Sequence, residues 1–187
     1  RKDVAAVVVK EKPDPIFNLT NAFMDRNAGQ ALVFLNSLLT SGFHLLQILK
    51  SFENSIRKLL IVHDCIADAN KDARQLKTLT FNQFKQMILP LVQTRDLQTE
   101  ERLMLQEKAL THATIRKKDL PKDLFLAANS KNPYPVYQLF LKAQNFSPAE
   151  IRQIFHFISD LDYLVKTSPV SAQTKLEQFI IQVCSKG

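Results

Sequence analysis

The spacing of apolar residues between Asn27 and Val62 predicts two consecutive helices. Apolar positions recur at intervals of three and four, which is the pattern of an amphipathic helix. Gly42 lies between the two stripes and can adopt the left-handed conformation that ends a helix. Asn27 can cap the first helix, with Gln30 reaching back to it. The stripes comprise Ala31, Leu32, Phe34, Leu35, Leu38 and Leu39, then Leu45, Leu46, Leu49, Phe52, Ile56, Leu59 and Leu60.

We expect this short connection to hold the two helices antiparallel as neighbours, with the rest of the chain packed around them. The preceding helix begins at Asp14-Pro15, and residues 25–27 form the turn into the pair. Ser147–Glu150 begins a later helix with a capping serine, a proline and a glutamate. In that helix, Asp162 and Lys166 have the spacing of an ion pair. Further stripes comprise Ile16, Leu19 and Phe23, then Val136, Leu139 and Phe140, then Ile151, Ile154, Phe155, Ile158, Leu161 and Leu164, and finally Leu176, Phe179, Ile180 and Val183.

Residues 68–130 have denser charges of both signs and more scattered apolar residues. Thr80 is placed to cap a helix that Pro90 ends, and Thr99 to cap a second one. The second stripe would comprise Leu103, Leu105, Leu110 and Ile115. Because 68–130 is too short to bury much core by itself, we interpret it as an insertion.

Composition strengthens an all-α prediction. The chain has 3 glycines and no tryptophan, 45% of its residues are hydrophobic, and runs of alternating β-branched residues are few. We therefore predict a bundle of about seven to eight helices. Residues 1–13 would be the end of a preceding domain with a linker, and 14–187 the bundle. The start at Arg1 also suggests a piece of a longer protein.

The formal charge of +7 leaves two interpretations open. It is compatible with a nucleic acid or acidic protein partner, and also with a lysine-rich surface that only solvates the protein, which is the interpretation we favour. Arg116-Lys117-Lys118 could contact a phosphate backbone. No aromatic residues interleave with it to stack bases, which favours a solvated helix end.

No residue set predicts catalysis, a cofactor or a metal, so we expect no enzyme activity. A glycine-rich phosphate loop is absent from the sequence. Asp160 and Asp162 are two apart and point to different helix faces. The spacing within His63-Asp64-Cys65 does not suit zinc, and no second ligand pair follows. The isolated histidines, which we interpret as structural, are His44, His112 and His156.

The remaining sequence features indicate a reducing, cytoplasmic location. Cys65 and Cys184 lie far apart and lack metal-ligand spacing, which argues against a disulfide framework. No apolar run approaches the ~20 residues that cross a bilayer, so we expect no membrane association. No secretion signal follows the first residues.

Several stretches together resemble the C-terminal domain of the delta subunit of the bacterial DNA polymerase III clamp loader. Residues 3–4 resemble the end of that family's lid domain. The similar residues are Ile16–Phe23, Gln30–Leu32, Leu35, Leu38, Leu39, Gly42, Leu45, Leu46, Leu49, Ile56–Leu60, Asn132–Tyr134, Val136, Phe146, Ser147, Asp162, Lys166, Leu176 and Glu177. The segment 68–130 departs from the family, which usually has a shorter connection there.

The resemblance implies a helical collar domain that assembles with other clamp-loader subunits. In the family, an ATPase-like N-terminal module opens the sliding clamp without hydrolysing ATP. This sequence does not contain that module, so we expect assembly without clamp opening, and only weak DNA binding. The alternatives are a basic helical nucleic-acid-binding domain and a helical enzyme whose site is assembled from distant residues.

Overall fold

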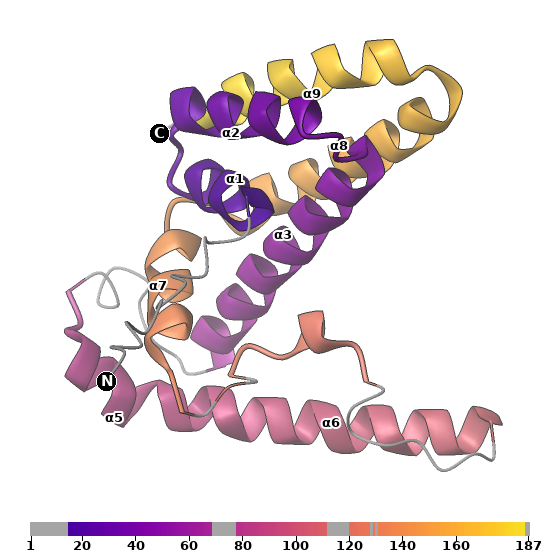
Figure 1. Ribbon diagram of the computed structural model, residues 1–187. Helices are drawn as coiled ribbons and strands as arrows, with labels where there is room; N and C mark the ends of the chain where they lie inside the picture. The colour runs from indigo at the N-terminus through magenta and orange to yellow at the C-terminus, as the bar shows by residue number, and fades with distance from the viewer. Residues whose placement is uncertain (1–14, 69–77, 112–119, 128, 130, 186–187) are drawn as a thin grey trace, which may run out of the picture.

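The computed structural model describes residues 15–68, 78–111, 120–127, 129 and 131–185 (Figure 1). These residues form helices and no strand, which confirms the all-α prediction. The elements are α1 (Pro15–Met24), α2 (Ala28–Thr40), α3 (Leu45–Asp68), α5 (Phe81–Met87), α6 (Leu89–Thr111), the short 3₁₀ helix η2 (Lys122–Leu124), α7 (Tyr134–Ala143), α8 (Pro148–Thr167) and α9 (Pro169–Cys184). None of the helices in these ranges is long and apolar enough to cross a bilayer.

Helix α3 runs through the middle of the molecule and packs mainly against α8 and α7 (Figure 1). Helices α1, α2 and α9 gather at the end where α3 begins, and α5 and α6 lie toward the end where α3 stops. The predicted antiparallel pairing of the first two stripes is wrong, because α2 packs mainly on α1 and α9. The short connection fixes only where α3 starts. Its direction follows from the partners that bury its apolar face.

Gly42 has the left-handed φ of 83° that the sequence predicted for the end of α2. The chain turns there, and the Gly42 and Phe43 amides donate to carbonyls of the last turn of α2. An added Cβ at Gly42 would meet no atom within 4 Å, so space does not restrict this position. The requirement for glycine is therefore conformational.

The core is centred on Phe23 of α1, which is fully buried. Its ring meets Phe52 of α3 edge-on at 4.9 Å between centroids. It also stacks at 6.0 Å on Phe146 and at 5.7 Å on Phe179 of α9. Aromatic pairs of this kind contribute about 0.5–1.5 kcal/mol each beyond burial. The cluster joins elements from both ends of the chain.

The helix starts predicted from local sequence are confirmed at three positions. Asn27 Oδ1 accepts the Gln30 amide at 3.0 Å, and Ser147 Oγ accepts the Glu150 amide at 3.2 Å. Thr80 forms a full capping box with Gln83. Each bond satisfies an amide that has no partner within its own helix.

The helix boundaries predicted at Pro90 and Thr99 are wrong. Pro90 is the second residue of α6 and does not end a helix, and Thr99 lies within α6 and does not cap it. A proline in the first turn removes an amide that needs no helical partner, so α6 begins directly after α5. Leu105, predicted to face the core, is 69% exposed. The predictions for Asp3–Val9, Asp14, Ile115 and Arg116–Lys118 lie outside the described residues.

Candidate interaction surfaces

Arg26 occupies the turn between α1 and α2 with a left-handed φ of 56°, which is uncommon for a residue with a side chain. Its Nη2 lies 2.7 Å from Glu150 Oε2, and its Nε donates to the Asn145 carbonyl at 2.9 Å. Nη1 donates to the Val183 carbonyl. The guanidinium carbon lies 4.4 Å from the centroid of the Phe146 ring. One side chain therefore joins the α1–α2 turn to the start of α8 and the end of α9.

Burial explains why Arg26 has so many partners. Its side chain is 9% exposed and that of Glu150 is 17% exposed. A charge removed from water is stable only when paired and hydrogen-bonded. The Val183 carbonyl lies in the last turn of α9, where carbonyls lack helical partners and the helix dipole favours a cation. Sequence reasoning placed Arg26 in a turn but missed its role, because its partners lie 119 to 157 positions away.

A second network fastens the same turn to α7. Lys142 Nζ lies 2.7 Å from Asp25 Oδ2 and 3.0 Å from Asn21 Oδ1. Asn145 Nδ2 donates to the Met24 carbonyl at 2.9 Å. The turn at residues 25–27 is thus held from two sides, which fixes α1 and α2 relative to α7.

Residues 120–127, here called the strap, connect α3 to α6. Asp123 of η2 forms an ion pair with Arg57 of α3. Asp96 of α6 accepts the amides of Leu126 at 3.2 Å and Ala127 at 2.7 Å. Burial raises the pKa of the Asp96 carboxyl, and the two amides partly oppose that rise. The strap therefore links α3 to α6, and it lies within the segment predicted to be an insertion.

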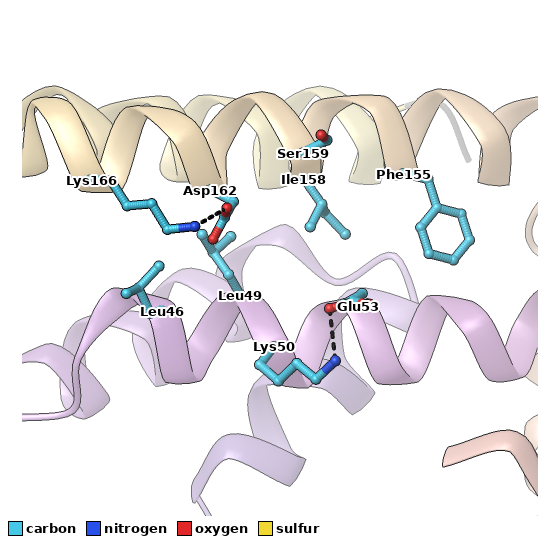
Figure 2. A pocket seen from close by; sticks show the side chains of 9 residues that line it. All are labelled: Leu46, Leu49, Lys50, Glu53, Phe155, Ile158, Ser159, Asp162 and Lys166. Atoms are coloured by element: carbon cyan, nitrogen blue, oxygen red, sulfur yellow. Dashed lines mark hydrogen bonds and ion pairs between the residues drawn. The ribbon is translucent and has the colours of Figure 1, made fainter. Parts of the chain in front are cut away.

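A groove of about 490 Å³ runs between α3 and α8 (Figure 2). Its apolar lining consists of Leu46, Leu49, Phe155 and Ile158. Its polar lining consists of Lys50, Glu53, Ser159, Asp162 and Lys166. Figure 2 shows two ion pairs there, Lys50–Glu53 at 3.0 Å on α3 and the predicted Asp162–Lys166 at 2.5 Å on α8. This volume is in the range of cavities that bind ligands.

The structure separates the residues considered for metal or catalytic chemistry. His63 Nε2 lies 3.0 Å from the Ala143 carbonyl of α7, while Asp64 pairs with Arg95 of α6 at 3.4 Å. Burial raises the pKa of the Cys65 thiol, which disfavours a thiolate nucleophile. Among the residues whose structure is described, no three His, Cys, Asp or Glu side chains come together as a metal site.

The other residues considered for metal or catalytic chemistry do not gather into one site in the described structure. His44 Nδ1 accepts the Leu46 amide at 3.2 Å in the turn before α3. His156 and Asp160 are exposed on α8, and His112 lies outside the described residues. Burial raises the pKa of Cys184, whose Sγ faces the Phe23 carbonyl at 4.0 Å. These residues therefore contribute to packing or lie in solvent.

A comparison with family models matches residues 94–183 to the DNA polymerase III delta subunit, C-terminal domain. The resemblance to that domain is thereby confirmed for this part of the chain. The matched range includes α7 and α8 and most of α6 and α9, and it begins inside the 68–130 segment. Searches of curated proteins and of solved structures returned no match to the chain.

Proposed function

We propose that this chain belongs to a DNA polymerase III delta-like subunit and is the domain through which that subunit assembles into the clamp loader. Residues 94–183 carry the similarity to the delta subunit. It would act by binding other clamp-loader subunits, without catalysis. Contact with the sliding clamp would belong to an N-terminal module outside this sequence. The family match is the observation that carries the proposal.

The geometry supports this role because contacts between distant segments join the helices into one bundle. The Phe23 cluster and the Arg26 network join α1, α3, α8 and α9, and Lys142 adds α7. A protein that holds others in register needs surfaces whose relative positions are fixed, and a preorganised surface loses less free energy on binding. We also propose that residues 14–187 form one collar domain that contains 68–130 as an insertion.

Reconstitution tests the proposal. The 187-residue chain is mixed with the other clamp-loader subunits, and the mixture is analysed by size-exclusion chromatography with light scattering. We expect the chain to elute in a stoichiometric complex. Arg26→Met, which loosens the bundle, should weaken that complex, whereas the exposed Lys175→Met on α9 should leave it intact. Elution of the chain alone under all conditions would contradict the proposal.

A duplex DNA titration separates this role from nucleic-acid binding. If the chain acts through protein contacts, DNA binding stays weak. Tight binding whose log affinity falls steeply with log salt concentration would instead show extensive phosphate contacts. That result would favour the basic nucleic-acid-binding alternative.

A further inference from the structure

The groove between α3 and α8 has a shape that could accommodate a third helix. The two helices run antiparallel along it, as Figure 2 shows, and present side chains to the space between them. Along α8 the groove extends from Phe155 to Lys166, a length of about 16 Å at a helical rise of ~1.5 Å per residue. That length accommodates about three turns of helix.

The lining of the groove is apolar at its base. Leu49 and Ile158 are buried between the two helices, and Leu46 and Phe155 are half-buried beside them. Helices dock into such grooves through apolar residues spaced three and four apart. The base therefore fits the apolar face of an amphipathic helix.

The lysine side chains of the groove are more exposed than its carboxylates. Lys50 and Lys166 are 60% and 58% exposed, on opposite sides of the groove. Their partners are less exposed, at 30% for Glu53 and 47% for Asp162. Glu53 is also shared with Arg57. Exposed ion pairs contribute little, so either ammonium group can exchange its partner for an incoming carboxylate.

We propose that the groove binds an acidic amphipathic helix of a partner protein, about three turns long, with carboxylates on both flanks that pair with Lys50 and Lys166. The half-buried Leu46 and Phe155 offer apolar contact, and the two lysines set the charge preference and orientation. This proposal goes beyond assembly in the clamp loader, because it specifies a partner chemistry at one place on the bundle.

Two synthetic helical peptides test it. Both carry leucines at i, i+3, i+4 and i+7, and their flanks carry glutamates in one and lysines in the other. In calorimetric titrations of the whole chain, we expect the glutamate peptide to bind about tenfold more tightly. The methyl NMR signals of Leu46 and Ile158 should shift on binding.

A double charge reversal, K50E/K166E, should invert the preference so that the lysine peptide binds more tightly. The matched control is K85E/K175E, which changes the net charge equally at exposed positions on α5 and α9. Equal binding of both peptides, an equal effect of the control variant, or methyl shifts confined to other helices would overturn the proposal. So would a dimer in sedimentation experiments that K50E/K166E converts to monomer, because a second copy would then fill the groove.

The peptide titration requires no other clamp-loader subunit. Its failure would therefore remove the groove proposal alone. Failure of the reconstitution would instead remove the assembly role.

Discussion

Arg26 and Glu150 lie 124 positions apart in the sequence and form an ion pair at 2.7 Å in the interior of the bundle. Their pairing joins the turn between α1 and α2 to the start of α8. Glu150 was expected only as the third residue of a helix start, and its carboxylate turns toward Arg26. This relationship makes the strongest stability prediction.

Replacing Arg26 with methionine should lower the free energy of unfolding by about 3–5 kcal/mol, because Glu150 would remain buried without its cation. Urea denaturation measures the change. Glu150→Gln should cost less, since the glutamine can still accept from Arg26, and a double-mutant cycle gives the coupling energy. The control is Lys166→Met at the exposed pair with Asp162, where the expected change is within about 0.5 kcal/mol. Similar losses at both pairs would contradict the central role of Arg26.

Gly42→Ala should lower the free energy of unfolding by about 1–2 kcal/mol, because alanine is strained at the left-handed φ of 83°. The space around it is open, so no steric clash contributes. Gly29→Ala is the matched control. It lies in the first turn of α2, and its added Cβ would meet only Asn27 Oδ1 at 3.8 Å. There we expect a gain of about 0.5 kcal/mol from the reduced freedom of the unfolded chain. Thermal unfolding of both variants gives opposite signs if the conformational explanation holds.

Asp96 should make stability depend on pH in the acidic range. Burial raises its pKa above the usual 3.8, so folding favours the neutral carboxyl. This contribution is fully present below the unfolded pKa and is lost as pH rises through the folded pKa. The stability of the native chain relative to Asp96→Asn should therefore increase from neutral pH down to about pH 4. Denaturant titrations at several pH values measure the difference, and a difference that falls on acidification would contradict the assigned direction.

Leu105→Gln should change the free energy of unfolding by less than about 0.5 kcal/mol, because the Leu105 side chain is largely exposed on α6. Phe23→Ala should cost about 3–5 kcal/mol, since the Phe23 ring contacts three others in the core. The comparison uses the same denaturation assay. A large loss at Leu105 would show that α6 is packed in a way the structure does not have.

The accuracy of the sequence predictions depends on the range of the interactions involved. The caps at Asn27, Thr80 and Ser147 were predictable because each bond spans three residues. The Asp162–Lys166 pair was predictable for the same reason, because it spans only four residues. Gly42 could also be predicted, since the end of an apolar stripe marks where a left-handed residue is needed.

Contacts between distant segments were not predictable in this way. The stripe of α2 shows that one face is buried, but not that α1 and α9 bury it in place of α3. In α6, the predicted stripe through Leu105 suggested a buried face, yet Leu105 is largely exposed. Pro90 was expected to end a helix and Thr99 to cap the next one, but both lie within α6. The groove between α3 and α8 depends on the relative position of two helices, which no local pattern contains.

The attachment of the α1–α2 turn to Val183 has a consequence for the way a ribosome makes this protein. Helix α1 and the turn after it cannot complete their contacts until α9 has emerged from the exit tunnel, since both Phe23 and Arg26 contact α9. During translation α1 and α2 would thus expose apolar surface to chaperones until α9 is available to cover it.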